Sequence, residues 1–191
     1  MLTVVAGLRP HNGRTPDKVK QVVSSNSKTP PPLARLYARP GFLLRRAHQI
    51  SAAVFEDACR GLELTPAQFG VLTVLQAHPG LGQSSLARAL GFDKVTVLRV
   101  LRGLQARGLV RRVPAEDNRR NVSVTLTAEG AELLQLAQKP AEKAYRRLME
   151  PLDRGQQEQL LALLQLLTGG LEDEARAAFV PPATPAQRQA A

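Results

Sequence analysis

The spacing of apolar and small residues between positions 83 and 108 constrains the fold of this 191-residue chain more than any other feature. A short helical pattern ends at Gly91, and a longer one starts after Asp93, a residue type that caps helix N-termini. The positions that two closely crossing helices would bury are apolar or small, namely Leu86, Ala87, Leu90, Phe92, Val97, Val100, Leu101 and Leu104. Because glycine tolerates the backbone of a tight turn, this pattern predicts a helix-turn-helix whose second helix spans about residues 93–107.

A predicted pair of strands follows this motif directly. The run 110–113 and the strictly alternating run 122–126 predict two strands, and the charged segment 114–120 predicts the turn between them. A β-hairpin placed directly after a helix-turn-helix makes a winged helix. Arg119 and Arg120 lie at the predicted tip of its wing.

Helical patterns flank the predicted winged helix on both sides. Apolar residues recur at three- and four-residue spacing over about residues 42–60. A second helix is predicted over residues 65–78, with a threonine as N-cap and a proline at its first position. Residues 128–170 are also helical in pattern, and Thr127 is placed to cap them.

Two prolines and a leucine-rich run set the expectations for the C-terminal half. Pro140 and Pro151 should kink or break the helical region. The run 160–167 is apolar on nearly every side of a helix, so a small module cannot bury it and a second copy of the chain would cover it. The predicted fold class is therefore mainly α with a small β-wing, a winged helix-turn-helix joined to a helical dimerisation region.

The net charge of +10 is concentrated in two parts of the chain. Residues 1–40 hold seven basic residues and one acidic residue, and residues 83–127 hold nine basic and three acidic residues, so each block carries +6. A basic surplus of this kind favours a polyanionic partner. Only the second block lies within strongly patterned sequence, so it is the block expected to bind DNA in an organised way.

Composition shifts divide the chain into four predicted parts. These are a disordered basic arm (1–38), a helical dimerisation region (39–62 and 128–172), a winged helix-turn-helix DNA-binding domain (63–127) and a C-terminal tail (173–191). The arm has two interpretations, loose contact with DNA phosphate or a solvated tail, because its spacing matches no motif.

Several classes of protein are excluded by what the sequence lacks. The single cysteine, Cys59, excludes an intrachain disulfide and a thiolate metal cluster, and it is either a small core residue or an oxidant-sensing thiol. Three scattered histidines, no phosphate-binding glycine loop and no nucleophile elbow argue against an enzyme, so we expect no catalytic residue, metal or cofactor. No apolar run approaches the roughly 20 residues that span a bilayer, so we expect a cytoplasmic protein with no membrane partner.

Three sequence stretches together resemble the MarR family of bacterial transcription regulators, over roughly residues 40–170. They are Arg107-Gly108-Leu109-Val110-Arg111-Arg112, the basic wing, and Leu126-Thr127-Ala128-Glu129-Gly130. The resemblance implies a homodimer that binds a double-stranded, pseudo-palindromic operator, most often as a repressor.

The wing departs from the pattern of the family in one respect. Members usually carry Asp-x-Arg at a fixed distance before Leu-Thr. Counting back from Leu126, the arginine is Arg120 and the aspartate position holds Asn118, whereas counting from Asp117 makes the arginine Arg119. Either arginine therefore remains a candidate for the narrow minor groove, whose potential attracts guanidinium groups.

The remaining DNA contacts are predicted from the two helices of the helix-turn-helix. The exposed side of the second helix offers Lys94, Val95, Thr96, Leu98, Arg99 and Arg102 to the major groove. Ser84 and Ser85, at the start of the first helix, suit a phosphate. For Arg102, as for Arg107, the alternative to a DNA contact is a surface role, as a solvated helix charge or a salt-bridge partner.

The resemblance also implies a small anionic aromatic effector, such as a hydroxynicotinate or a salicylate-like compound. Its pocket would lie between the dimerisation helices and the DNA-binding domain, lined by Phe42, Arg45, Arg46, His48, Gln49, Phe69, Thr73 and Arg99. A carboxylate pairs with arginine, and a ring needs an apolar slot. The alternative is an architectural or anti-silencing DNA-binding protein without a ligand, in which the arginines are ordinary surface charges.

Overall fold

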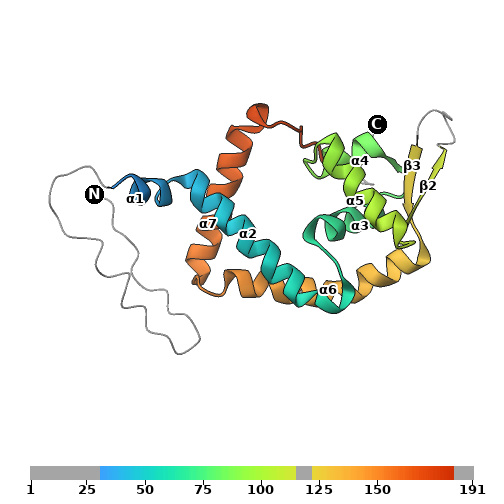
Figure 1. Ribbon diagram of the computed structural model, residues 1–191, viewed down its shortest axis with the longest axis horizontal. Coiled ribbons are helices and arrows are strands. Elements are labelled where there is room, and N and C mark those ends of the chain that lie inside the picture. The colour runs from blue at the N-terminus through green and yellow to red at the C-terminus, as the bar shows by residue number, and fades with distance from the viewer. Residues whose placement is uncertain (1–30, 115–121, 183–191) are drawn as a thin grey trace.

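The computed structural model describes residues 31–114 and 122–182. In chain order its elements are α1 (Pro32–Tyr37), α2 (Pro40–Ala58), α3 (Pro66–Ala77), β1 (Leu81–Gly82), α4 (Gln83–Ala89), α5 (Lys94–Ala106), β2 (Val110–Pro114), β3 (Val122–Leu126), α6 (Ala128–Met149) and α7 (Arg154–Gly170), with 3-10 turns at Arg60–Leu62 and Glu172–Glu174 (Figure 1). None of the helices in these two ranges is long and apolar enough to cross a membrane.

The winged-helix unit, residues 63–127, has the predicted architecture. Helices α3, α4 and α5 pack beside an antiparallel sheet in the order β1-β3-β2. Four apolar residues of α5 are buried, as the spacing predicted: Val97, Val100, Leu101 and Leu104. Gly91, in the turn between α4 and α5, has a φ of 61°, a backbone conformation that is strained for residues with a side chain. The fold class, mainly α with a small β-wing, is confirmed.

Side-chain caps fix three helix starts in this unit and beside it. Thr65 and the Gln68 side chain form a reciprocal capping box at α3, and the Asp93 carboxylate accepts a hydrogen bond from the Thr96 amide at α5. The Thr127 hydroxyl accepts from the amide of Gly130 at α6. Each cap satisfies an amide that the helix itself leaves without a partner, so local sequence sets where the elements begin.

The second part of the core joins α2 to α6. Phe55 and Cys59 of α2 are buried together with a row of small residues on α6, Ala137, Ala141 and Ala144. Small side chains let the two helices approach closely along their length. The winged-helix unit is therefore inserted in the sequence between two helices that pack on each other.

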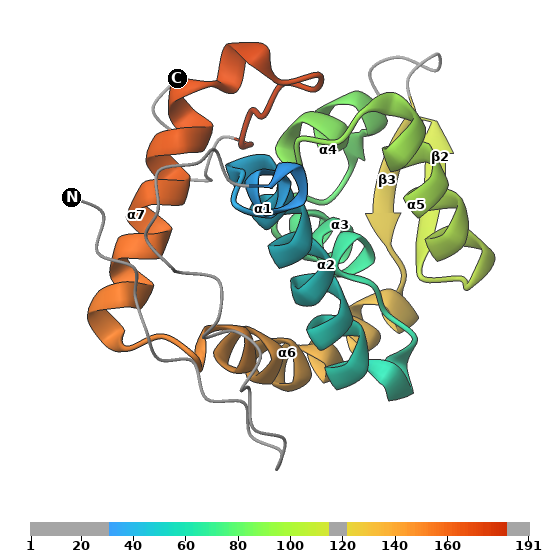
Figure 2. The same ribbon diagram turned by 60° about the vertical axis from the view of Figure 1, so that its left-hand side comes forward.

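The first half of α2 and the whole of α7 lie outside this core. Leu43 and Ile50 on α2 are exposed, although they continue the same apolar stripe. No residue of α7 is buried, and Leu166 is 73% exposed. Figures 1 and 2 both place α7 far from α5 and β2. The described chain thus presents a large apolar surface at the end opposite the wing.

Three expectations differ from the structure. Helix α6 continues through Pro140, because the buried residues on either side of it, Ala137 and Ala141, pack in the α2 contact and keep the helix whole. Pro151 does separate α6 from α7. In the segment expected to be a disordered arm, residues 32–37 are helical, with Pro32 at a first-turn position where proline is tolerated. The expected tail contains residues 175–182, which return to α4.

Candidate nucleic-acid interface

Helix α5 divides cleanly into a buried side and an exposed side. Lys94, Val95, Arg99 and Arg102 are exposed, and Thr96 and Leu98 are half-buried. Val95 is 75% exposed, the largest exposed fraction of any large apolar residue in the described parts of the chain. The Val95 side chain makes no favourable contact with water, whereas in the major groove it could make an apolar contact with the methyl group of a thymine.

The first turn of α5 is held by Asp93. Its carboxylate accepts hydrogen bonds from the Thr96 amide, at 2.7 Å, and from the Thr96 hydroxyl, at 3.0 Å. These two bonds lower the pKa of the Asp93 carboxyl, so the carboxylate is ionised near neutral pH. Because the hydroxyl of Thr96 already donates to Asp93, it can donate to DNA only after rotation, although its oxygen can still accept, and Val95 and Lys94 are the more exposed groups.

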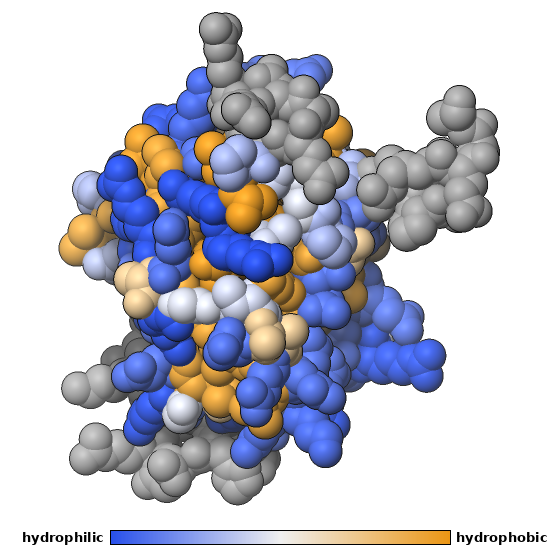
Figure 3. Space-filling view, turned by 90° about the vertical axis from the view of Figure 1, so that its right-hand side faces the viewer, coloured by the Kyte–Doolittle hydropathy of each residue, from blue (hydrophilic) through white to orange (hydrophobic). Residues whose placement is uncertain are grey.

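The surface around α5 is strongly basic. Within the described part of residues 83–127, seven residues are basic and only Asp93 is acidic. Neither Arg99 nor Arg102 is paired with a carboxylate in the described parts of the chain. Figure 3, which looks onto the winged-helix end, shows strongly hydrophilic residues around a band of apolar surface. A surplus of positive charge on the winged-helix unit favours binding of a polyanion such as DNA.

Of the other residues predicted to contact DNA, two lie on α4 and two lie outside the described residues. Ser84 is exposed and Ser85 is half-buried in the first turn of α4. Arg119 and Arg120 lie outside the described residues, between the ends of β2 and β3. Within the hairpin itself, the Nε of Arg111 donates to the Thr125 hydroxyl across the strand pair, at 3.1 Å.

Four of the predicted ligand-binding residues form a cluster at the start of α2. Arg45 and Arg46 each donate through Nη1 to the side-chain oxygen of Gln49, at 3.3 and 3.1 Å. The guanidinium of Arg45 lies 5.0 Å from the centre of the Phe42 ring, which in turn contacts the ring of Tyr37. Two positive groups therefore converge on one neutral oxygen, next to an aromatic surface.

Of the other predicted ligand-binding residues, His48 lies on α2 itself, and the remaining three lie on α3 and α5. Phe69 packs against Phe55, with ring centres 5.4 Å apart, and the Thr73 hydroxyl donates to the carbonyl of Phe69. His48 is exposed on α2 and Arg99 is exposed on α5. In the described residues no hydrogen bond or ring contact joins Phe69, Thr73 or Arg99 to the cluster on α2, and their place in one pocket with it stays a prediction.

Sequence reasoning missed the role of Arg107. Its guanidinium donates to the carbonyls of Glu63, at 2.6 Å, and Leu62, at 2.9 Å, and so ties the C-terminal end of α5 to the turn after α2. Glu63 has a φ of 48°, which few residues other than glycine adopt. The hydrogen bond from Arg107 to the Glu63 carbonyl helps to hold the backbone in this conformation. Arg107 lies 44 and 45 residues after the two residues whose carbonyls it binds, so no local sequence pattern could predict this contact.

Cys59 behaves as a core residue. Its side chain is buried, and burial raises the pKa of its thiol. A neutral, enclosed thiol reacts slowly with oxidants and alkylating agents. The packing therefore favours the first of the two interpretations of this cysteine.

Comparison with known proteins supports the same architecture. The family model described as MarR family matches residues 62–121. The transcriptional repressor NicR of Pseudomonas putida is 34% identical over 125 residues, which are 65% of this chain and 79% of NicR.

Two solved structures are similar over most of their length. BpsR of Bordetella bronchiseptica, whose DNA binding is regulated by 6-hydroxynicotinic acid, has a TM-score of 0.65 and 30% identity, covering 69% of this chain and 94% of BpsR. The transcriptional repressor CouR bound to a 23-mer DNA duplex has a TM-score of 0.65 and 32% identity, covering 73% of this chain and 99% of CouR.

The fold, the basic exposed side of α5 and the hairpin after it define a winged helix-turn-helix DNA-binding protein. With the matches to NicR, BpsR and CouR, the chain belongs to the MarR family. It is accordingly a transcription regulator and not an enzyme.

Proposed function

We propose that this protein is a homodimeric transcriptional repressor that binds a pseudo-palindromic operator and is released by a small aromatic carboxylate. The observation that carries the DNA-binding part is the exposed side of α5, where Lys94, Val95, Arg99 and Arg102 stand free of the core. An α-helix fits the major groove, and the first turns of a recognition helix supply base contacts.

The roles proposed for individual residues follow from their chemistry. Val95 and Leu98 meet thymine methyl groups, Arg99 takes a guanine edge or a phosphate, and Lys94 pairs with a phosphate. The same surface includes the remaining candidates, Thr96, Arg102, Ser84 and Ser85, as phosphate or base contacts. One of the wing arginines, Arg119 or Arg120, enters the minor groove.

Dimerisation is supported by the apolar surface that the described chain leaves open. The exposed leucines of α7 and the exposed half of the α2 stripe lie at the same end of the molecule. Exposed apolar residues in this number mark an interface, and a second copy of the chain brings the same surfaces in a self-complementary arrangement. Two copies would present two α5 helices, as a palindromic operator requires.

The DNA-binding proposal is tested with a duplex selected by the full-length protein from a random pool. Arg119→Ala and Arg120→Ala are each compared with Arg146→Ala, which removes an equal charge on α6 outside the winged-helix unit. We expect one of the wing variants to lose about 1–3 kcal/mol of binding free energy, with Arg146→Ala unchanged. Equal affinity of both wing variants and the wild type would contradict the wing assignment.

The effector proposal rests on the cluster at the start of α2. An amide oxygen is a weaker partner for two guanidinium groups than a carboxylate is, so an aromatic acid would take the place of Gln49 with its ring near Phe42. BpsR, whose DNA binding is regulated by 6-hydroxynicotinic acid, is a relative in keeping with a hydroxynicotinate-like ligand. Phe69, Thr73 and Arg99 would complete the pocket only if the second copy of the chain, or a movement of α5, brings them together with His48 and the cluster.

The effector is tested by titrating 6-hydroxynicotinate and salicylate against the protein and against its complex with the selected duplex. We expect one of them to raise the melting temperature and to release DNA, and Arg45→Ala to weaken both effects. If neither acid stabilises the protein, the effector proposal fails. Equal affinity for the selected and a scrambled duplex would instead favour the architectural DNA-binding protein.

The dimer is tested by analytical ultracentrifugation at micromolar concentration. Leu166→Glu places a charge on the most exposed leucine of α7, and Gln159→Glu places the same charge at an exposed polar position of the same helix. We expect only Leu166→Glu to dissociate the dimer. A monomeric wild-type protein would contradict the proposal.

A further inference from the structure

One charged side chain of the hairpin lies on the core side of the sheet. Successive side chains of a strand point to opposite faces, so Val110 and Arg112 of β2 share the face opposite to Arg111. Val110 is buried, and Arg112 lies across from Val124 of β3, whose side chain is also fully buried. Arg111 is exposed on the other face, where it donates to the Thr125 hydroxyl. The half-buried Arg112 side chain therefore extends toward the helices.

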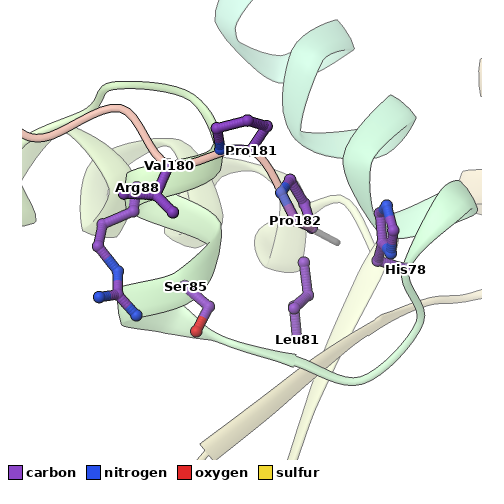
Figure 4. Close-up of a pocket in the computed structure, with 7 residues that line it drawn as sticks. All are labelled: His78, Leu81, Ser85, Arg88, Val180, Pro181 and Pro182. Carbon is purple, nitrogen blue, oxygen red and sulfur yellow. The ribbon is translucent and has the colours of Figure 1, made fainter. Parts of the chain in front are cut away.

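Arg112 lies where the core of the winged-helix unit ends. The next pair along the hairpin, Pro114 and Val122, is exposed. At the other end of its row across the sheet, Leu81 of β1 lines a pocket together with residues of α4 and residues 180–182 (Figure 4). Strand β2 contacts α5 and runs back alongside it toward the start of the helix (Figures 1 and 2). Arg112 is thus at the edge of the core, beside α5, on the strand that leads to the wing tip.

The guanidinium of Arg112 has two enclosed donors without an acceptor. Its Nε and Nη2 atoms are buried, and neither forms a hydrogen bond. Among the residues that the structure describes, they are the only enclosed side-chain nitrogen or oxygen atoms in this condition. An enclosed polar group of a charged side chain costs free energy when it lacks a partner, so its presence in a folded protein calls for an explanation.

The two donors form one edge of the guanidinium group. Nε and Nη2 present parallel N–H groups, so this edge can bind two oxygens of one phosphate or carboxylate group. Within the described part of residues 83–127 the one carboxylate is that of Asp93, which already accepts from Thr96. This part of the chain therefore offers Arg112 no free carboxylate, and a phosphate supplies the same pair of oxygens.

The proposed DNA complex brings a phosphate backbone to this place. A recognition helix in the major groove and a wing in the neighbouring minor groove lie on either side of the sugar–phosphate strand that separates the two grooves. Side chains located between α5 and the wing tip consequently face that strand. Arg112 has such a location, and its long stem lets the guanidinium turn outward from the edge of the core to a phosphate.

We propose that Arg112 is a further DNA contact, whose guanidinium leaves its enclosed position and binds a backbone phosphate through Nε and Nη2 when the operator docks. The inference rests on the proposed function, because it adds a residue to the same DNA surface. Phosphate contacts carry no sequence information, so Arg112 adds affinity and positions the wing on the duplex, whereas α5 reads the bases.

The test compares three variants of the full-length chain with the wild type. Arg112→Met keeps an unbranched stem and removes the guanidinium, and Arg112→Lys keeps the positive charge. Arg111→Met is the matched control, because it removes the same charge one position away, on the opposite face of the strand. Affinity is measured over a series of salt concentrations for the duplex selected from a random pool and for a scrambled duplex. The stability of the free proteins is measured by urea unfolding.

We expect Arg112→Met to bind both duplexes about tenfold more weakly than the wild type, with the ratio of the two affinities unchanged. The slope of log affinity against log salt should fall by about one for each bound chain. Arg112→Lys should retain the wild-type slope, because an ammonium group also pairs with phosphate, and so should Arg111→Met. The urea midpoint of Arg112→Met should equal that of the wild type or exceed it, since unpaired donors are no longer enclosed.

Equal effects of Arg112→Met and Arg111→Met on affinity and slope would show no more than a general influence of charge and would overturn the proposal. A lower urea midpoint of Arg112→Met would also overturn it, because the guanidinium would then be paired already in the free protein. Absence of binding to either duplex by the wild type would instead overturn the proposed function. The two failures are therefore distinguishable in one set of measurements.

Discussion

Gly130 provides the sharpest prediction for how the winged-helix unit is joined to α6. A Cβ atom at this position would lie 2.0 Å from the carbonyl oxygen of Leu109 and 3.0 Å from its carbonyl carbon. The same oxygen accepts a hydrogen bond from the Thr127 amide, at 3.2 Å, and Thr127 caps α6 through the Gly130 amide. The first turn of α6 therefore rests directly on the backbone that leads into β2.

The magnitude for Gly130→Ala follows from this contact. Both close atoms belong to the backbone, so relief needs a shift of about 1 Å in α6 or β2 rather than a side-chain rotation. Overpacking costs about 1–3 kcal/mol, and the strained hydrogen bonds at Thr127 add about 1 kcal/mol each. The preference of a helix for alanine over glycine returns about 1 kcal/mol. We expect a net loss of about 3 kcal/mol in the free energy of unfolding.

The assay is urea unfolding at a fixed protein concentration, followed by circular dichroism. Gly103→Ala in α5 is the matched control, because its new Cβ would lie 3.5 Å from the Gln68 side chain, an ordinary contact. It should leave stability unchanged or raise it by up to about 1 kcal/mol. A Gly130→Ala variant within about 1 kcal/mol of the wild type, with an unchanged slope against urea, would refute the close contact.

Three further predictions concern single side chains. Arg107→Lys keeps the charge but cannot bridge the carbonyls of Leu62 and Glu63, so urea unfolding should show a loss of about 1 kcal/mol, and no loss would contradict that bridge. Cys59, whose thiol pKa is raised by burial, should react with iodoacetamide at pH 8 about a hundredfold more slowly in the native protein than in urea, and equal rates would show that it is accessible. The pKa of Asp93 is lowered on folding, so its contribution to stability is present above the unfolded value of 3.8 and is lost as the pH falls through the lower folded value. Thermal unfolding of Asp93→Asn should therefore depend less on acid than that of the wild type, and parallel pH profiles would argue against this carboxylate.

The winged-helix unit could be predicted from sequence because its signals are local. Caps at Thr65, Asp93 and Thr127, the glycine turn and the alternating strand each depend on a few neighbouring residues. The family resemblance rested on the same stretch, and the fold and family are confirmed.

The features that sequence reasoning missed depend on residues far apart in the chain. Arg107 binds carbonyls more than 40 residues away, and the amide of Val180 donates to the carbonyl of Arg88 on α4, a residue far earlier in the chain. Pro140 was expected to interrupt α6, but packing against α2 outweighs its local effect. Sequence reasoning placed eight residues in one ligand pocket, and four of them contact one another at the start of α2. The grouping of the other four with them stays a prediction.

The insertion of the winged-helix unit between α2 and α6 has a consequence for the order of events during synthesis. All strands of the sheet and the helices α3, α4 and α5 lie within residues 63–127, so they are present once β3 has left the ribosome, whereas α6, which packs on α3 and β3, follows later. Helix α2 is made earlier, yet Ala137, Ala141 and Ala144, which cover Phe55, are translated only afterwards. The nascent chain therefore contains the elements of the winged helix first, keeps an uncovered apolar helix in the meantime, and receives the exposed leucines of α7 last.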